Sequence, residues 1–423
     1  MHAEGRQSEA RRLPPAPVRA ALALACSALF IWCAWAAVRA GASRVVSDYA
    51  GRSRSREAAD ASVALAPSDP EAHYQRANVL ADSGDYAGAA PAYEAALRLR
   101  PRDYVIWVEL GKTREETGDA AGALEAFRRA VSLAPFYARP RWLLGNALLR
   151  AGSREEAAAE LRRAAESDPG LYPNLLQTLW HATGRDPRAL ARAAGPRTPE
   201  ETLALVRFLI KEGEPGEGLE LLRGSGARLT DESRRTLVRD LVAAERFADA
   251  YAVWSEGRGS VGSLTDGGFE DDARSEEDGF GWRFASGGQG VRLSLDADAP
   301  REGARSLKVE YAGNSEPSQP AASRLVAVEP GARYRLTFWA RTKELVTGGP
   351  PFVQVVSAGK SGEALAEAAP LPASTDGWRE AALEFTAPSA GAVRVALRRK
   401  PCATSPCPAF GAVWLDAFGL RKL

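Results

Sequence analysis

The chain has 423 residues, a length that leaves room for about two or three domains. Its formal net charge is +1, so no overall electrostatic field draws it to nucleic acid or to acidic lipid. It contains only three histidines, which argues against a histidine-based catalytic triad or a histidine-rich metal site and leaves carboxylate chemistry open.

Residues 20–38 form an uncharged run rich in alanine, leucine and tryptophan, with arginines before it and Arg39 at its end. A run of about 19 residues is just long enough to cross a bilayer as a helix. We predict a retained transmembrane anchor over residues 20–40. A cleaved signal peptide is the main alternative, because Ala-x-Ala-like sites lie near residues 40–42, and a buried soluble helix is a third. Cys26 and Cys33 are interpreted as small apolar residues of this run.

Arginines on the two sides of the run balance, so the positive-inside rule does not decide the orientation. We expect residues 1–19 to be a cytoplasmic tail and the rest to be exported, because of a predicted disulfide and a sugar-binding-like module described below. This predicts a single-pass protein of the bacterial inner membrane whose bulk is periplasmic or otherwise extracytoplasmic.

An internal repeat of about 34 residues covers residues 70–171 in three full copies. Each copy has two helical periodicities of apolar residues, interrupted by glycine where a helix must end and by proline where the next begins. The residues in register are Gly84, Gly118 and Gly152, then Ala89, Ala123 and Ala157, then Tyr93, Phe127 and Leu161, and last Pro101, Pro135 and Pro169. This pattern resembles the tetratricopeptide repeat, whose helical hairpins stack into an all-α solenoid with an inner groove.

The array is expected to extend beyond the three full copies, from residue 57 to residue 257. Residues 57–66, followed by Pro67, look like the second helix of an incomplete capping repeat. The pattern is degenerate over residues 172–257, where 198–222 and 231–254 still fit the template. Residues 172–197 fit it worst, because Asp186-Pro187 and Gly195-Pro196 interrupt the helical periodicity.

The resemblance implies that the first helix of each hairpin lines the groove and binds a protein or peptide partner. Amides, aromatic rings and charges at these positions suit an extended peptide, and a solvated helix face is the alternative for each of them. Some family members bind a peptide C-terminus through a particular arrangement of Lys, Asn and Arg, the carboxylate clamp, and this sequence supplies only part of that arrangement. The implied groove residues are Tyr74, Asn78, Asp82, Val108, Lys112, Glu116, Arg139, Trp142, Asn146 and Arg150.

From about residue 262 the helical spacing disappears, and short alternating runs appear between glycine- and proline-rich turns. Strands at this density predict an all-β antiparallel sandwich over residues 262–423. The predicted strands are 291–295, 306–311, 334–341, 352–356, 381–386, 392–398 and 413–420.

A linear series of short motifs runs through this region. It comprises Asp266-Gly-Gly-Phe-Glu270, Trp282, Pro330-Gly-x-x-Tyr334, Phe338-Trp-Ala-Arg341, Asp376-Gly-Trp378, Phe385-x-Ala-Pro388 and Trp414-Leu-Asp416. The series resembles the galactose-binding-like, jelly-roll carbohydrate-binding modules that are attached to xylanases and glucanases. The resemblance implies that Glu270 and Asp416 hold a structural calcium ion, with carbonyls as further ligands; a surface acid and a strand-edge cap are the alternatives.

Sugar binding needs an exposed aromatic plane beside hydrogen-bonding groups. Alternation along residues 334–341 puts Tyr334, Leu336 and Phe338 in the core and Arg335, Thr337, Trp339 and Arg341 on the other face. We therefore predict Trp339 as the glycan platform, flanked by Arg335 and Arg341, with Gln354 and Arg394 as neighbours. Trp282, Phe284 and Trp378 are alternatives, and hydrophobic packing is the preferred interpretation of Trp378 and Trp414.

Cys402 and Cys407 lie in the short loop Pro-Cys-Ala-Thr-Ser-Pro-Cys-Pro. We predict a disulfide that closes a hairpin tip, because zinc would need further cysteine or histidine partners nearby. A disulfide in turn favours an oxidising compartment and export.

An enzymatic function would have to use the acidic run Glu270, Asp271, Asp272, Glu276, Glu277 and Asp278, whose carboxylates could hydrolyse glycosides. The run lies in a glycine-containing loop without a fold of catalytic size around it, so a solvated loop is favoured. The leading hypothesis is a non-catalytic, membrane-anchored scaffold of the bacterial envelope that binds a protein and a glycan during assembly or export of a surface polysaccharide. An accessory or degenerate relative of a glycan-processing enzyme, and a protein-only assembly factor with a structural sandwich cap, are the alternatives.

Overall fold

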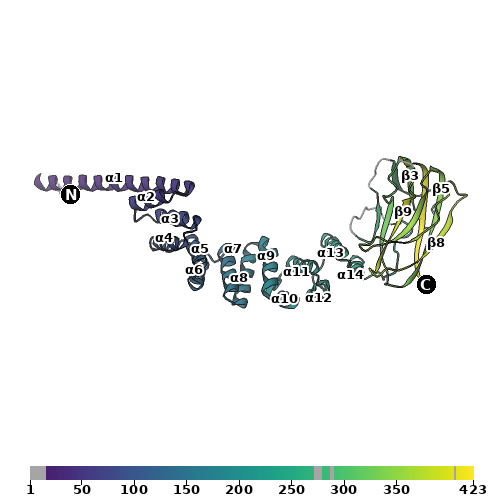
Figure 1. Ribbon diagram of the computed structural model, residues 1–423, viewed down its shortest axis with the longest axis horizontal. Helices are drawn as coiled ribbons and strands as arrows, with labels where there is room; N and C mark the ends of the chain where they lie inside the picture. Colours follow the sequence, from purple (N-terminus) through teal and green to yellow (C-terminus); the bar gives the residue numbers. More distant parts are fainter. Residues whose placement is uncertain (1–15, 271–278, 286–289, 404–405) are drawn as a thin grey trace, which may run out of the picture. The chain divides into compact units, whose positions relative to one another are not determined.

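The computed structural model describes residues 16–270, 279–285, 290–403 and 406–423 (Figure 1). Most of the predicted cytoplasmic tail, and the acidic run from Asp271 to Asp278, lie outside the described residues. The chain divides into two compact units, residues 1–195 and residues 196–423. The predicted fold class is confirmed: a long apolar N-terminal helix precedes helical hairpins, and an all-β sandwich ends the chain.

The first unit is entirely helical over its described residues. Its hairpins pair each helix with the next, as the repeat predicts. The helices are α1 (Ala16–Ser53), α2 (Arg56–Leu65), α3 (Pro70–Asp82), α4 (Tyr86–Leu99), α5 (Tyr104–Glu116), α6 (Ala120–Leu133), α7 (Ala138–Arg150), α8 (Arg154–Ser167), α9 (Tyr172–Ala182) and α10 (Pro187–Ala194). Residues 172–197, the poorest fit to the template, thus still form a hairpin, because Pro187 occupies the first turn of α10, where a missing N–H costs nothing.

Local sequence sets the ends of these helices. Asp69 and Asp103 cap α3 and α5 by accepting a hydrogen bond from a backbone N–H of the first turn. Gly84, Gly118 and Gly152 follow the first helix of three hairpins with φ of 81° to 83°, a left-handed conformation that glycine adopts without strain.

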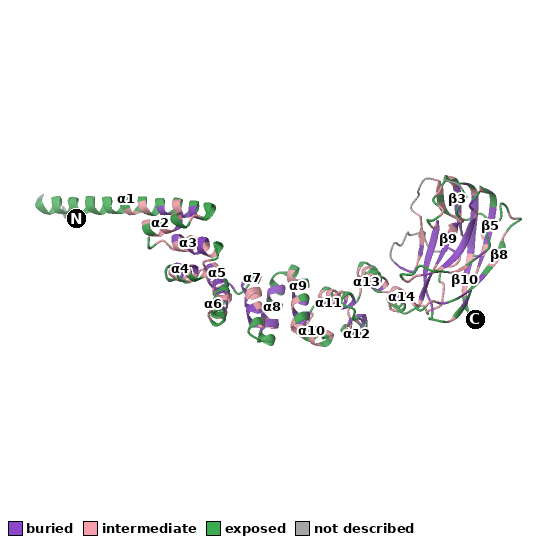
Figure 2. Cartoon of the chain, in the orientation of Figure 1, coloured by how far each residue is buried: buried purple, intermediate pink, exposed green. Residues whose placement is uncertain are grey.

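The expectation of an incomplete first repeat is wrong, because α1 supplies the missing helix. The helix does not end near Arg39 but continues to Ser53, and residues 39–53 pack against α2 and α3. Arg39 Nε donates to the carbonyl of Leu65 at 2.9 Å, and Ser43 Oγ donates to the carbonyl of Ser62 at 2.9 Å. Over residues 18–34 the same helix is exposed along its apolar side chains (Figure 2).

The second unit begins with α11 (Pro199–Lys211), α12 (Pro215–Ser225), α13 (Asp231–Ala243) and α14 (Phe247–Trp254) and continues into the sandwich. One antiparallel sheet has the order β1-β4-β9-β6-β7, and we call it the first sheet; the other has the order β2-β3-β10-β5-β8, and we call it the second sheet. The first sheet comprises β1 (Trp282–Phe284), β4 (Ala322–Ala327), β9 (Ala392–Arg399), β6 (Pro351–Ser357) and β7 (Ala364–Glu367). The second comprises β2 (Val291–Asp296), β3 (Ser306–Asn314), β10 (Pro408–Lys422), β5 (Arg333–Thr347) and β8 (Arg379–Thr386).

All seven predicted strands are present, whereas β1, β4 and β7 were not predicted. All six residues of β4 are buried, so the strand shows no alternation of apolar and polar residues. One side of β4 faces the core between the sheets through Ala322 and Val326. Its other side packs Leu325 and Ala327 against helical residues such as Leu241 and Tyr251.

The helices α11 to α14 and the first sheet therefore share one hydrophobic core. Phe280 lies in this core and packs edge-on against Tyr251, with ring centroids 5.1 Å apart. Glu245 Oε1 also accepts a hydrogen bond from the backbone N–H of Lys360 at 3.2 Å, just beyond β6. Helices α11 to α14 are thus part of the same compact body as the sandwich, whereas α9 and α10 belong to the first unit.

Candidate functional site

A hollow of about 560 Å³ lies on the groove side of the first repeats. Four residues implied by the resemblance line it together: Asn78, Asp82, Lys112 and Glu116. The end of α1 contributes Asp48, Gly51 and Arg52 to the same wall. The groove residues of α3 and α5 thus meet as the repeat template predicts, and α1 closes one side of the hollow.

Acidic groups outnumber basic ones in this hollow, and most of them are paired. Lys112 Nζ donates to Glu109 at 2.6 Å, and Arg139 donates to the other oxygen of Glu109 at 2.8 Å. The hydroxyl of Tyr93 donates to Asn78 Oδ1 at 2.7 Å, and burial raises the pKa of Tyr93. The phenol therefore stays protonated and orients the amide of Asn78, which also hydrogen-bonds to Tyr74.

The other implied groove residues differ in position. Val108 is wrong as a contact residue, because its side chain is only 1% exposed, on the face of α5 that packs inside the stack. Tyr74 packs beside Tyr93, Asn146 donates back to the carbonyl of Trp142, and Arg150 pairs with Glu115. The hollow is formed by α1, α3, α4 and α5, and it is not lined by Arg139, Trp142, Asn146 or Arg150.

The predicted glycan platform, Trp339, lies on the outer face of the second sheet. The core assignments on this strand were right: Tyr334, Leu336 and Phe338 are buried between the sheets. The outer face of Trp339, however, is covered by the guanidinium of Arg301, 4.1 Å from the ring centroid. Arg341 is likewise engaged, stacking on Trp414 at 4.5 Å and on Trp378 at 5.3 Å.

Gln354 and Arg394 are not neighbours of Trp339, and that expectation is wrong. Gln354 lies on β6 and Arg394 on β9, both in the first sheet, whereas Trp339 and Arg335 lie on β5 in the second. The predicted set is therefore split between the two sheets. The cause is the sandwich itself, because chain order does not tell which of two antiparallel sheets a strand joins.

The outer face of the first sheet carries a row of side chains that crosses all its strands. Strand register places Arg283, Ser323, Ala396, Gln354 and Glu367 side by side, from β1 through β4, β9 and β6 to β7. Arg394 and Arg398 flank Ala396 on β9, two residues to either side. Small residues in the middle of the row and polar ones at its ends leave a shallow trough, about 19 Å across four strand spacings.

Two adjoining cavities open along this trough. The cavity of about 730 Å³ is lined by Phe352, Gln354, Glu367, Arg398, Cys402 and Cys407. The cavity of about 570 Å³ is lined by Arg283, Phe284, Tyr311, Ser323 and Arg398. A polar network links the side chains of the first: Gln354 Nε2 donates to Glu367 at 2.8 Å, and Arg398 donates to Gln354 Oε1 at 3.1 Å. Lys400 lies 4.0 Å from the ring centroid of Phe352. Phe352 is itself buried, so the trough offers a sugar hydrogen-bonding groups rather than an open aromatic plane.

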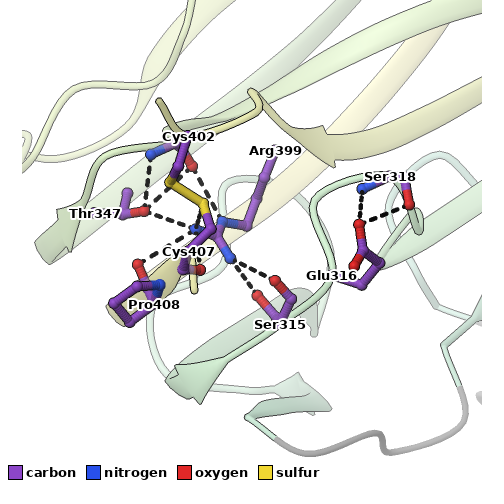
Figure 3. The surroundings of a disulfide bond; sticks show 9 residues. Ser315, Glu316, Ser318, Thr347, Arg399, Cys402, Cys407 and Pro408 are labelled. Carbon is purple, nitrogen blue, oxygen red and sulfur yellow. Dashed lines mark hydrogen bonds between the residues drawn. A yellow bond between two sulfur atoms is a disulfide. The ribbon is translucent and has the colours of Figure 1, made fainter. Parts of the chain in front are cut away.

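The loop beside the trough is held by a disulfide and a buried arginine (Figure 3). Cys402 and Cys407 are bonded, with their Cα atoms 5.6 Å apart. Arg399, which is 5% exposed, donates to the carbonyl of Cys407 at 2.9 Å, to Thr347 Oγ1 at 2.8 Å and to the carbonyl of Ser315 at 3.0 Å. These bonds fix one wall of the trough.

Glu270 and Asp416 lie on either side of Gly268 and cap the turn at residues 301–305. Asp416 Oδ2 accepts the N–H of Arg301 at 2.7 Å, and Glu270 Oε1 accepts the N–H of Ala304 at 2.8 Å. Burial raises the pKa of Asp416, and the charge of Glu270 adds to the rise. Asp416 is buried and Glu270 is exposed, and no third acidic, cysteine or histidine side chain joins them among the described residues, so a calcium ion at this pair stays a prediction.

Sequence reasoning missed Arg283, Ser323, Phe352, Arg398 and Tyr311 as candidate residues. Residues of this kind are common on any strand, and only the strand order brings them together. The sequence held one indication of the face that Phe352 and Gln354 occupy. Along β6 they alternate with Val353 and Val355, which lie in the core between the sheets, so Phe352 and Gln354 point to the opposite face.

Comparison with known families assigns both parts of the chain. Residues 70–103 and 108–172 match tetratricopeptide repeat models, and residues 261–404 match the model of a carbohydrate binding domain. The chain therefore carries tetratricopeptide repeats, a protein-interaction module, followed by a carbohydrate-binding module, and modules of both kinds are typically non-catalytic. A comparison with curated proteins finds no match.

Several solved structures are similar to the helical part. The MamA RS-1 ArsTM double mutant is 23% identical, with a TM-score of 0.34, 45% of this chain covered and 98% of that one. MamA 41-end from Desulfovibrio magneticus RS-1 is 20% identical, with a TM-score of 0.30 and coverages of 44% and 92%. YrrB, described as a TPR protein with an unusual peptide-binding site, is 20% identical, with a TM-score of 0.32 and coverages of 43% and 88%.

Proposed function

We propose that this protein is a non-catalytic, membrane-anchored adaptor of the bacterial envelope. In this proposal it binds a protein segment in the repeat groove and a glycan in the trough of the first sheet, during assembly or export of a surface polysaccharide. The observation that carries the proposal is the trough itself: a five-strand row of polar side chains, hollowed on both sides of Arg398, within a carbohydrate-binding module.

Anchoring is supported by the two halves of α1. By length and composition this helix can cross a membrane, and the apolar stretch with the highest hydropathy is fully exposed. Cleavage near residues 40–42 would remove Arg39, which caps the carbonyls at the end of α2. A retained helix keeps the first repeat whole, so we favour an anchor over a cleaved signal.

The hydrogen-bonding groups of the hollow support a protein partner. Lys112 offers donors to a peptide backbone, and Asp82 and Glu116 offer acceptors, along the same hollow. The disulfide supports an extracytoplasmic location of the sandwich, since such bonds persist in oxidising compartments.

A glycan-array screen of the full chain, purified in detergent, tests the glycan part of the proposal. Gln354→Ala removes the centre of the trough network, and Trp339→Ala removes the alternative platform on the second sheet. We expect binding that Gln354→Ala weakens and Trp339→Ala leaves unchanged. The reverse pattern would move the site to the second sheet, and no binding to any glycan would refute a glycan-binding role.

A further inference from the structure

Three arginines line the trough. Register with β4 and β6 places them on one face: Arg283 opposite Ser323, Arg394 opposite Leu325, and Arg398 opposite Phe352. Ser323 and Leu325 point to the same side of β4, so Arg283 and Arg394 flank that strand diagonally. The three positive charges thus lie within one small area of sheet.

None of the three has a carboxylate partner among the described residues. Arg398 donates to the amide oxygen of Gln354 and to the carbonyl of Ser318, both neutral acceptors. Arg283 Nε is buried and has no hydrogen bond within the part of the chain that the structure describes. Burial and the nearby charge of Arg283 lower the pKa of Arg394. By contrast, Arg141, a half-buried arginine of the repeats, pairs with Glu160 at 2.6 Å.

A further polar group without a partner opens into the same space. Tyr311 is 4% exposed, its hydroxyl has no hydrogen bond among the described residues, and the residue lines the cavity of about 570 Å³ together with Arg283 and Arg398. Desolvated cations and an unsatisfied hydroxyl are costly to maintain, and a bound anion would relieve both costs. Guanidinium groups bind carboxylates with paired, charge-assisted hydrogen bonds.

We propose that the glycan bound in the trough is acidic, a polysaccharide whose sugar units carry carboxylates. This inference rests on the proposed glycan-binding function. Arg283 binds a carboxylate at the β1 side of the trough, where Tyr311 donates to a neighbouring oxygen, and Arg394, diagonally across β4, adds a second positive charge. Gln354, Glu367 and Arg398 bind sugar hydroxyls at the other side. A chain of several units, rather than a small anion, matches a trough that crosses all five strands.

The test compares polyuronates with their own methyl esters, because esterification keeps the backbone and removes only the charge. The full chain in detergent is titrated calorimetrically with polygalacturonate, polymannuronate and polyglucuronate, each beside its ester and beside neutral xylan and glucan. We expect at least one acid to bind about tenfold or more tightly than its ester, with an affinity that falls as salt increases.

Substitutions locate the effect in the trough. The double variant Arg283→Gln, Arg394→Gln should lose about tenfold or more in affinity for the acid and little for the ester. Arg292→Gln, which removes an exposed arginine of β2 in the second sheet, is the matched control and should change neither. Tyr311→Phe keeps the ring and removes only the hydroxyl, so it should weaken binding of the acid without lowering the melting temperature.

The outcomes separate the two proposals. If a neutral glycan binds and no acid binds better than its ester, the inference of an acidic ligand is overturned while the glycan-binding function stands. If the acid binds equally well to the double variant, the arginines are not its site and the inference fails. If no glycan of any kind binds, the proposed function fails with it.

Discussion

Single glycines set how closely the paired helices of a repeat approach each other. A Cβ at Gly111 would lie 2.6 Å from a ring carbon of Phe127, and one at Gly145 would lie 2.6 Å from Leu161. In these two hairpins, α5–α6 and α7–α8, the helices therefore touch through a hydrogen atom rather than a methyl group. Ser43 stands two repeat lengths before Gly111, and its small side chain bonds to α2 at the equivalent contact.

Gly111→Ala should destabilise the repeats by about 1–3 kcal/mol, because the added methyl group forces Phe127 or the backbone to move. Gly216→Ala is the matched control: nothing lies within 4 Å of its Cβ position in α12. Alanine is the better helix former, so that variant should be neutral or slightly more stable. Urea denaturation followed by circular dichroism measures both. Equal effects of the two substitutions would contradict the packing argument.

Asp416 makes the proposed calcium site testable through pH. Burial raises its pKa in the folded state above the unfolded value of about 3.9, so the folded chain binds more protons in that interval. Without calcium, the stability that this group contributes should fall as pH rises from about 4 through the raised pKa, and stay low above it. The difference in unfolding free energy between the wild type and Asp416→Asn, measured across pH, should show this slope.

Calcium should offset the loss of stability that follows ionisation of Asp416, because the predicted ion would bind the ionised carboxylates of Glu270 and Asp416. We expect calcium to raise the melting temperature of the wild type near pH 7 and to have little effect near pH 4. Glu270→Gln should abolish the increase, whereas Glu367→Gln, an exposed acid on β7, should keep it. An equal increase in all variants would show that calcium acts elsewhere.

At the scale of elements, α1 has two functions in one continuous helix. Its first half is apolar and exposed, and residues 39–53 complete the first repeat through Ala50, which is buried against Ala59 and Val79. The helix also walls the groove hollow with Asp48 and Arg52. Because α1 is continuous, no flexible linker separates the anchor from the first repeat, and the direction of the anchor helix fixes the direction in which the repeats begin.

Removing residues 1–53 should therefore destabilise the repeats, whereas removing residues 1–34 should only abolish detergent or membrane binding. The longer deletion leaves the apolar faces of α2 and α3 exposed, which costs about 25 cal/mol for each Å² of apolar surface. Thermal denaturation of both fragments beside the full chain provides the measurement. If the fragment that begins at residue 54 melts at the same temperature as the one that begins at residue 35, residues 39–53 are not part of the repeat core.

At the scale of the whole molecule, the last helices and the sandwich act as one body. Leu325, Ala327 and Ala392 would be exposed on the outer face of the first sheet if α11 to α14 were removed. These helices also lie at the Leu325 end of the trough, so the proposed glycan site borders the helical core. The compact body that carries this site is thus larger than the match at residues 261–404.

A fragment of residues 196–423 should melt cooperatively and at a higher temperature than a fragment of residues 262–423. The shorter fragment exposes an apolar patch and should bind a hydrophobic dye and aggregate. The variant Tyr251→Ala, which removes a ring from the shared core, should lower the melting temperature of the longer fragment by several degrees. Two identical melting temperatures would show that the helices add nothing to the sandwich.

The sequence by itself determined the features that depend on neighbours along the chain. The spacing of Gly84, Gly118 and Gly152 predicts helical hairpins, because helix ends are local events. Alternation along β5 predicts that Tyr334 and Phe338 are buried, because side chains of a strand alternate between faces. The apolar run before Arg39 is likewise readable from composition.

Only the tertiary structure decided which strands lie side by side and what covers them. In the folded chain Gln354 and Trp339 lie in different sheets, and Arg301 covers Trp339. Arg283 and Arg394 lie on one face of the first sheet. The tertiary structure also joined α1 to the first repeat and buried β4 on both sides. These features depend on contacts between residues far apart in sequence. Such contacts form where apolar faces pack against one another in the folded chain, and the local periodicity of the sequence does not determine which faces pack together.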